Sequence, residues 1–246
     1  MLYVLGIGSG TKENMTFACY DAIQKSDIIV GYDKYVKQIE NLLDNQEIYS
    51  TSMTGEIQRC KKAVEFAKSG KNVSVICSGD SGIYAMSGLI LELVDENLPV
   101  TIIPGVTSST LASSLLGAPI MHDSCTISLS DLLTPIEVIY KRVECAAMAD
   151  FVISFYNPKS KKRADYLENA VDILLKYKKA TTPVGIVKKA YDSEQEIYIT
   201  TLDSIDYNLV DMHSIVIVGN DSSYVKNGKI ITKRGYETKY KEEFNG

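Results

Sequence analysis

Short apolar runs alternate with stretches of helical periodicity in the first half of the chain, and this alternation is the feature that most constrains the fold. A helix is predicted over 56–68, where apolar residues recur on one face and charged residues, Arg59 among them, lie largely off it. Buried strands that alternate with amphipathic helices form βαβ units, so the sequence predicts a mainly parallel sheet. The strand candidates lie at 2–7, 28–30, 73–77 and 100–103, and the apolar face of the helix consists of Ile57, Cys60, Ala63, Val64 and Ala67.

The alternation pauses near Gly117-Ala118-Pro119, where we place a domain boundary between residues 1–117 and 118–246. Strand candidates in the second part follow one another without intervening helices, which predicts an antiparallel or mixed sheet. We therefore expect a two-domain α/β fold, with a mainly parallel N-terminal sheet and a mixed C-terminal sheet. The expected elements of the second part are a helix at 135–147, a strand at 150–156, a helix with Ala164, Leu167, Ala170, Val171, Leu174 and Leu175 on one face, and strands at 184–187, 196–201 and 215–218.

Composition excludes several classes of protein. The net charge of −5 argues against a nucleic-acid partner, because affinity for phosphate backbones depends on clustered Lys and Arg. The longest apolar run, around 100–106, is interrupted by Pro104 and is too short to span a bilayer. The N-terminus begins directly with a strand-like segment, without the pattern of a signal peptide. These features predict a cytoplasmic protein with no membrane partner.

Cysteine and histidine usage argues against a metal of the protein's own. The chain has five cysteines in no C-x-x-C pair and only two histidines. This pattern is typical of reduced, mostly buried thiols, and we expect no protein-bound metal.

Glycine-bearing loops follow three of the predicted strands, at 6–10, 78–84 and 104–109. The carboxyl ends of parallel strands share one edge of a sheet, where loop backbones and helix N-termini bind ligands. Two alternatives remain open. Asp80 could merely cap a helix, and the first loop with Asp33 could belong to a nicotinamide-dependent oxidoreductase, although Thr11 occupies the position of the last fingerprint glycine.

The segment 122–135 is dense in hydroxyl and carboxylate side chains just past the expected boundary. Clefts between domains are favoured sites for small molecules. Alternatively, Ser130 or Asp131 could cap the helix beyond Pro135. The sequence lacks G-x-S-x-G, so it has no nucleophile elbow of the Ser-His-Asp type.

Together these motifs resemble the precorrin-3B (cobalt-precorrin-3) C-17 methyltransferases of cobalamin biosynthesis, which belong to the tetrapyrrole methylase superfamily. The resemblance runs in order from residue 2 to about residue 236. It departs from the family at Ser9 and Ser81, where proline is usual, and at Ile136, where tryptophan is usual. The matching strings are G-I-G-S-G at 6–10, S-M-T at 52–54 with Glu56 and Arg59, S-G-D at 78–80, P-G-V-T at 104–107, S-L-S-D-L-L-T-P at 128–135, Asp150-Phe151, F-Y-N-P at 155–158 and 232–236.

The resemblance implies a dimeric two-domain tetrapyrrole methylase, with S-adenosylmethionine bound in the cleft between the domains and a tetrapyrrole as substrate. S-adenosylhomocysteine would be the product. Cofactor contacts carried over by motif are Gly79, Asp80, Ile83, Thr107, Ser108, Tyr156, Asn157 and Ala190. Substrate contacts are Gly8, Ser9, Met53, Thr54, Glu56, Ser128, Ser130 and Asp131.

Methyl transfer from a sulfonium needs alignment within a desolvated cleft and no catalytic nucleophile. The ring contraction that the family couples to this step needs proton transfers, and the candidate groups are Asp131, His122 and Glu56. Two further alternatives are a methylase of the same fold acting on another precorrin carbon and a noncatalytic tetrapyrrole-binding protein. The composition, rich in Lys, Asn, Ile and Tyr, favours the cobalt-containing substrate of the anaerobic route.

Overall fold

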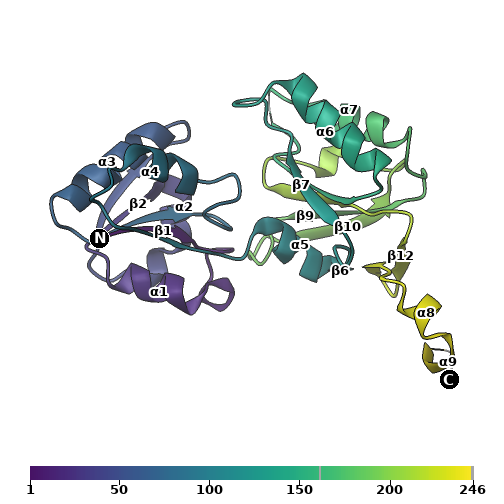
Figure 1. The fold of residues 1–246 in the computed structure, drawn as a ribbon, viewed down its shortest axis with the longest axis horizontal. Helices are drawn as coiled ribbons and strands as arrows, with labels where there is room; N and C mark the ends of the chain where they lie inside the picture. The colour runs from purple at the N-terminus through teal and green to yellow at the C-terminus, as the bar shows by residue number, and fades with distance from the viewer. Residues whose placement is uncertain (161, 245–246) are drawn as a thin grey trace. The chain divides into compact units, whose positions relative to one another are not determined.

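The computed structural model describes residues 1–160 and 162–244, which form two compact units, Met1–Ser108 and Ser109–Gly246. We expected the boundary after residue 117. The units instead divide at the start of helix α5 (Ser108–Leu116), because its buried side chains Ala112 and Leu116 pack with strands of the second unit. Figure 1 shows the first unit in purple to blue and the second in teal to yellow.

The first unit is built on a five-stranded sheet in the order β3-β2-β4-β1-β5. Every pairing in it is parallel, which confirms the expected mainly parallel sheet. Since all the strands run the same way, their carboxyl ends and the loops that follow lie along one edge. The strands are β1 (Leu2–Gly6), β2 (Ile28–Tyr32), β3 (Glu47–Thr51), β4 (Val73–Cys77) and β5 (Val100–Ile103).

Helices cover both faces of this sheet (Figure 1). Buried residues from α1 (Phe17–Gln24) and α2 (Asp33–Gln38) pack on one face, and those from α3 (Glu56–Lys68) and α4 (Ser87–Leu93) pack on the other. Successive strand side chains point to opposite faces, so β1, β2, β4 and β5 contribute to both cores, whereas β3 contributes Tyr49 to one of them. Short 3-10 helices at Lys12–Asn14 and Glu40–Leu42 complete the unit.

Helix α3 agrees with its predicted bounds, but two side chains at its start lie on unexpected sides. Ile57 was expected on the apolar face and is 59% exposed, whereas Arg59 was expected largely off it and is only 5% exposed. The first turn lies beside the end of β3, and Arg59 turns toward Thr51 and Ser52 there, with which it forms hydrogen bonds.

The second unit is built on a five-stranded sheet in the order β10-β9-β11-β8-β7. β7 pairs parallel with β8, and the other pairings are antiparallel, which confirms the expected mixed sheet. The strands are β7 (Ser124–Ser128), β8 (Val152–Tyr156), β9 (Pro183–Lys188), β10 (Glu196–Thr201) and β11 (Ser214–Val218), and a 3-10 helix lies at Tyr207–Leu209.

One face of the second sheet packs against α6 (Ile136–Met148) and α7 (Tyr166–Leu174). The predicted apolar face of α7 included two residues too many, because Ala164 and Leu175 lie outside the helix and are exposed. The other face packs against α5 and a small sheet in which β13 (Lys229–Thr232) joins β12 (Ser223–Lys226) to β6 (Gly117–Ala118).

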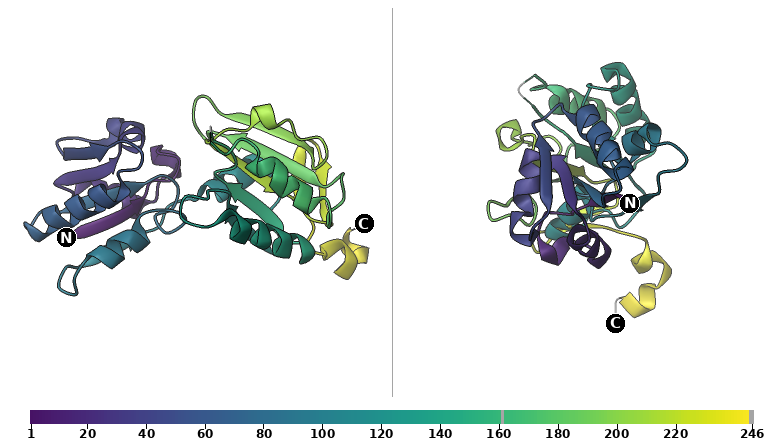
Figure 2. Two further views of the ribbon diagram at one scale, coloured as in Figure 1. Left: turned by 90° about the horizontal axis from the view of Figure 1, so that it is seen from above. Right: turned by 90° about the vertical axis from the view of Figure 1, so that its left-hand side faces the viewer.

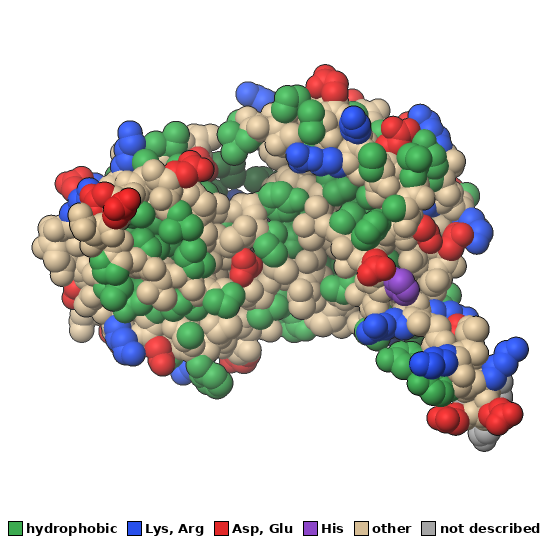
Figure 3. Space-filling model, viewed as in Figure 1, with side chains coloured by type: hydrophobic (Ala, Val, Ile, Leu, Met, Phe, Trp, Pro, Cys, Tyr) green, Lys and Arg blue, Asp and Glu red, His purple; other side chains and the backbone are tan. Residues whose placement is uncertain are grey.

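The polar composition after Tyr236 predicts a frayed tail, but the described residues there belong to two short helices, α8 (Tyr236–Lys239) and α9 (Lys241–Phe244). Figure 2 shows these helices in yellow, extending from the β12–β13 hairpin. On the face shown in Figure 3, basic and acidic side chains are interspersed in both units. Within the described residues, no helix has the length and apolar character needed to cross a membrane.

Candidate functional site

The three glycine loops of the first unit meet at the carboxyl edge of its sheet. Gly8 and Gly79 exchange two backbone hydrogen bonds, of 3.0 and 2.8 Å between nitrogen and oxygen. A Cβ atom on Gly105 would lie 2.1 Å from the carbonyl oxygen of Gly79, so only glycine allows the third loop to approach the second. The predicted convergence of these loops is confirmed within this unit.

Asp80 ties two of these loops together. Its Oδ1 accepts a hydrogen bond from the amide of Gly82 at 2.8 Å, and its Oδ2 accepts one from the amide of Gly105 at 3.0 Å. Helix α4 begins only at Ser87, with Met86 at its N-cap position, so the helix-capping alternative for Asp80 is wrong. Beside this anchor Gly79 has a left-handed backbone (φ 68°), and Ile83 is 37% exposed.

Tyr156 lies beside the start of helix α5 in the second unit. Its hydroxyl accepts a 2.9 Å hydrogen bond from the amide of Ser109, the residue that follows Thr107 and Ser108. Ala190, in the turn after β9, packs against the same apolar cluster as Tyr156. Within the second unit, Tyr156 and Ala190 thus belong to one apolar cluster, and Tyr156 lies beside the start of helix α5.

Asn157 connects this region to the segment after β7. Its backbone is left-handed (φ 51°), and its Nδ2 donates a 2.9 Å hydrogen bond to Oγ of Ser128. The carbonyl oxygen of Tyr156 accepts a bond from the amide of Leu129. β7 and β8 are parallel, so their carboxyl ends carry the two most specific strings of the sequence side by side.

Ser130 and Asp131 are held by two residues that the sequence analysis did not place in the site. Arg163 Nη1 donates to Ser130 Oγ at 2.5 Å and lies 3.4 Å from Asp131 Oδ1, while the Tyr166 hydroxyl donates to Asp131 Oδ2 at 2.8 Å. The hydrogen bond from Tyr166, followed by the smaller effect of the Arg163 charge, holds the pKa of Asp131 below its ordinary value.

Neither Ser130 nor Asp131 caps helix α6. The N-cap position is Pro135, and no side chain caps the helix there, so this alternative is wrong. In the sequence, Arg163 belongs to a basic cluster at 159–163, which is typical of a solvated face or an anion contact. Lys161 of that cluster lies outside the described residues. Tyr166 gave no signal beyond its place at a helix start.

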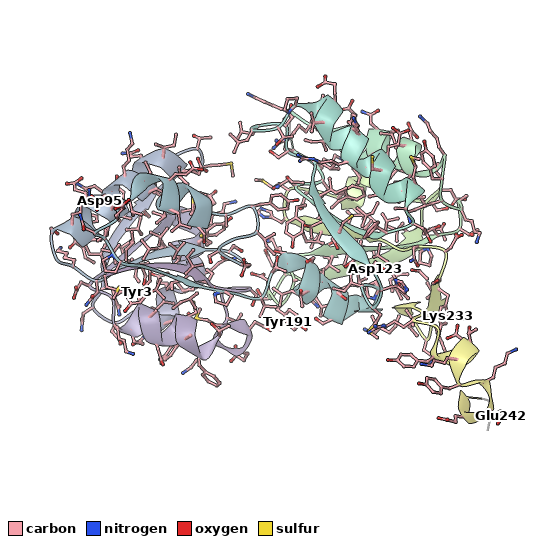
Figure 4. All side chains as sticks on the ribbon, viewed as in Figure 1. Tyr3, Asp95, Asp123, Tyr191, Lys233 and Glu242 are labelled. Atoms are coloured by element: carbon pink, nitrogen blue, oxygen red, sulfur yellow. The ribbon has the colours of Figure 1, made fainter. Side chains whose placement is uncertain are left out.

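His122 is not brought together with Asp131. It precedes β7, at the end of the strand opposite Ser128, near Asp123, which is labelled in Figure 4. Its side chain is 44% exposed, and its Nδ1 accepts a hydrogen bond from the amide of Asp123 at 2.8 Å. The length of β7 therefore separates this imidazole from the Ser128–Asp131 segment.

The remaining predicted substrate residues lie in loops of the first unit. Thr54 has a left-handed backbone (φ 73°), and Met53 beside it is 49% exposed. Glu56 opens helix α3, with its Oε1 3.6 Å from Nη2 of Arg59. In the first glycine loop, Gly8 also has a positive φ, and Ser9 Oγ lies 3.1 Å from the hydroxyl of Thr11.

A pocket of about 180 Å³ lies in the first unit, beside the ends of β2 and β4 and the start of α3. It adjoins both the Met53 loop and the Ser78 loop, which were assigned to different ligands from the sequence. Its lining residues are Tyr32, Tyr35, Met53, Glu56, Arg59, Ile76, Cys77, Ser78, Tyr84, Ala85 and Met86.

Among the described cysteines, Cys77 is the one that lines the pocket. Cys19, Cys60 and Cys77 are buried, Cys125 is half-buried and Cys145 is exposed. Across residues 1–160 and 162–244, His, Cys, Asp and Glu side chains nowhere gather in a group of three or more that could hold a metal ion.

Glycine loops at the carboxyl edge of the parallel sheet are typical of a ligand-binding α/β protein, and comparison with protein families identifies the class. Residues 1–206 match the family model described as Tetrapyrrole (Corrin/Porphyrin) Methylases. The chain belongs to this family of methyltransferases.

Two individual methyltransferases and one solved structure are similar to the chain over most of its length. The chain is 50% identical over 239 residues to a protein of Salmonella typhimurium named probable cobalt-factor III C(17)-methyltransferase, covering 96% of this chain and 99% of that one. It is 34% identical over 230 residues to the precorrin-3B C(17)-methyltransferase of a Sinorhizobium species, covering 91% and 90%. Among solved structures, the methyltransferase CobJ superposes with a TM-score of 0.90 at 31% identity, covering 94% and 99% of the two chains.

Proposed function

We propose that this protein transfers the methyl group of S-adenosylmethionine to C-17 of a cobalt-containing precorrin-3-type tetrapyrrole, with ring contraction, in cobalamin biosynthesis. The observation that carries the proposal is the 50% identity, over 96% of the chain, to a relative named for this activity on cobalt-factor III. The relative named for metal-free precorrin-3B is more distant, at 34% identity. This difference favours the cobalt form.

The residues present fit a nucleoside-bearing ligand such as S-adenosylmethionine. Gly79 has a left-handed backbone (φ 68°), and a Cβ atom there would be at ordinary contact distance from Thr107 (3.6 Å) and Ser108 (3.5 Å), so the backbones of these two loops lie close to each other. When bound, S-adenosylmethionine supplies a methyl group on a sulfonium, whose C–S electron pair leaves with sulfur. The residues proposed to hold it are Gly79, Asp80, Ile83, Thr107 and Ser108 from the first unit, and Tyr156, Asn157 and Ala190 from the second.

The chain's contribution to methyl transfer is alignment and exclusion of water. The ring carbon provides the electron pair of the new C–C bond, so no side chain has to act as a nucleophile. The substrate residues proposed for this task are Gly8, Ser9, Met53, Thr54, Ser128 and Ser130.

Ring contraction requires groups that accept and return protons. Asp131 is our first candidate, because two hydrogen-bonding partners hold its carboxylate beside Ser130. Glu56 is the second, at the mouth of the pocket in the first unit. His122 ranks below both, since it lies at the far end of β7 from Ser128.

The test is anaerobic incubation of the purified protein with S-adenosylmethionine and either cobalt-factor III or precorrin-3B. We expect S-adenosylhomocysteine and a ring-contracted product carrying one more methyl group at C-17 from the cobalt substrate, located by mass spectrometry and NMR. Methylation at another carbon would favour a different methylase of this fold. Binding without consumption of S-adenosylmethionine would favour a carrier, and stabilisation by NADH in place of S-adenosylhomocysteine would favour an oxidoreductase.

We also propose that the protein is a homodimer, as its resemblance to the family implies, and that it acts in the cytoplasm. Light scattering of the purified chain measures its molar mass in solution, which tests the dimer. Fractionation of the source cells shows which compartment contains the protein.

A further inference from the structure

Arg59 is a buried cation that borders the pocket of the first unit. The residue is 5% exposed and lies one turn into α3, with its side chain directed toward the end of β3. A charge removed from water is unfavourable unless hydrogen bonds and an opposite charge compensate it. The contacts of this guanidinium therefore show whether its buried charge is fully compensated within the protein.

Those contacts compensate the charge only in part. Nη1 donates to Oγ1 of Thr51 at 2.7 Å and to the carbonyl oxygen of Ser52 at 3.0 Å, and both acceptors are neutral. The carboxylate of Glu56 stands 3.6 Å from Nη2, beyond hydrogen-bonding distance, and is 37% exposed. A guanidinium has five N–H donors. Among the described residues, Arg59 has no further hydrogen-bond acceptor, and it is one of the residues that line the pocket.

The walls of the pocket add phenol and hydroxyl groups to an apolar surface. The rings of Tyr32 and Tyr35 stack edge to face with centroids 5.1 Å apart, which fixes their orientation. In the described part of the chain, neither hydroxyl has a hydrogen-bond partner. Ser78 and Tyr84 contribute two further hydroxyl groups. An apolar pocket with a few convergent polar groups is the usual form of a small-molecule subsite.

We propose that this pocket is a carboxylate-binding subsite, in which Arg59 forms a charge-assisted hydrogen bond with a side-chain carboxylate of a bound reactant. The proposal deepens the proposed function and rests on it. A volume of about 180 Å³ accommodates a short carboxylate arm and not a macrocycle. The pocket touches both Met53, proposed for substrate, and Ser78, next to the cofactor residue Gly79. The carboxylate can therefore come from the rim of the tetrapyrrole or from the methionyl group of the cofactor.

The position of Glu56 predicts opposite effects on carboxylate affinity for substitutions of Glu56 and of Arg59. Its carboxylate faces the same guanidinium, so it competes with an incoming carboxylate and repels it. Removing the charge of Arg59 should weaken carboxylate binding, and removing the charge of Glu56 should strengthen it. A merely structural Arg59–Glu56 pair would show a loss, or no effect, in both variants.

The experiment compares Arg59→Met, Arg59→Lys and Glu56→Gln with the wild-type chain. Two affinities are measured without turnover: S-adenosylhomocysteine by calorimetry, and the cobalt tetrapyrrole by its absorbance change. We expect Arg59→Met to weaken one of them by about 10- to 100-fold, the range of a charge-assisted hydrogen bond. Arg59→Lys should recover part of the loss, and Glu56→Gln should tighten the same ligand.

The affected ligand identifies the source of the carboxylate. A loss confined to the tetrapyrrole assigns the subsite to substrate, and a loss confined to S-adenosylhomocysteine assigns it to the cofactor. Unchanged affinities for both in a folded Arg59→Met protein overturn the proposal, as does weaker binding in Glu56→Gln. Because these readouts need no methyl transfer, they remain decisive if the proposed reaction fails.

Two further variants separate binding from folding. Lys62→Met removes a positive charge from the same helix at an exposed ion pair with Glu65, and it should change neither affinity. Ala85→Leu fills the pocket while keeping Arg59 and its loop contacts. If Arg59→Met does not fold, Ala85→Leu carries the test: reduced affinity for the same ligand supports the subsite, and wild-type affinity overturns it.

Discussion

The hydroxyl of Tyr166 donates a 2.8 Å hydrogen bond to Oδ2 of Asp131, joining the start of α7 to the most specific string of the sequence. This bond and the neighbouring Arg163 hold the pKa of Asp131 below its ordinary value, so the carboxylate is ionised at neutral pH. In its proposed role, Asp131 would therefore be deprotonated at the start of the reaction.

Asp131→Asn tests that role, because it keeps the size of the side chain and cannot accept a proton. We expect affinity for S-adenosylhomocysteine and for the tetrapyrrole to stay near wild type, and ring contraction to slow at least ~100-fold, the low end of general acid–base contributions. Single-turnover assays that follow methylated and contracted products separately make the measurement. Wild-type contraction rates would remove Asp131 from the mechanism and leave Glu56 as the next candidate.

Tyr166→Phe removes the hydrogen bond and keeps the ring. The pKa of Asp131 should then rise toward its ordinary value, so the acid limb of the contraction rate against pH should move to higher pH. Tyr177→Phe is the matched control, since it breaks an exposed tyrosine–carboxylate bond to Glu144. A pH profile that moves equally in both variants would contradict the assignment.

Gly79→Ala should destabilise the first unit and weaken cofactor binding, since the backbone of Gly79 is left-handed (φ 68°). For a residue with a Cβ atom this conformation costs about 1–2 kcal/mol. Gly88→Ala is the control: it lies within α4 with open space around its Cβ position, and helical alanine is favoured over glycine by about 0.5–1 kcal/mol. Thermal unfolding should move in opposite directions for the two variants. Equal stability and equal cofactor affinity in Gly79→Ala would show that the left-handed backbone is not required.

Alkaline pH should destabilise the first unit through its buried thiols. Burial raises the pKa of Cys19 and Cys77 to about 12 and that of Cys60 to about 11. The folded-state pKa values lie above the unfolded value of 9.0, so the stability is fully present below about pH 9 and is lost as pH rises toward the folded values. Urea titrations at about pH 8 and about pH 10 measure this loss as a decrease in the free energy of unfolding. Cys19→Ala should reduce the slope of stability against pH, and exposed Cys145→Ala should not.

Fully buried strands were the most predictable elements of this fold. The run Val73–Cys77 is apolar or small throughout and coincides with β4, because a central parallel strand is covered on both faces. Edge strand β3 was not predicted. Its sequence, Glu-Ile-Tyr-Ser-Thr, has partly exposed side chains, and the apolar signal is correspondingly weak.

Within the candidate site, the loops were predictable and their supporting cations were not. Glycines after strands indicate a ligand edge from sequence alone. The periodicity of a helix predicts the direction of a side chain about the helix axis. It does not predict which hydrogen-bond acceptors from another element, such as the end of a strand, lie beside that side chain. Arg59 is buried where the end of β3 offers it two oxygen acceptors, and the half-buried Arg163 donates hydrogen bonds to Ser130 and Ser160. Both contacts depend on tertiary structure.

The pairing of β6 with β13 sets an order of events during synthesis of the chain. It joins Gly117-Ala118 to Ile230-Ile231, and the Thr232 hydroxyl donates to the carbonyl of Pro119, 113 positions earlier. All five strands of the first sheet have been synthesised by residue 103, whereas the core around Leu116 and Ile230 requires nearly the whole polypeptide. A nascent chain arrested before residue 229 should therefore carry a folded N-terminal unit ahead of a protease-sensitive second unit.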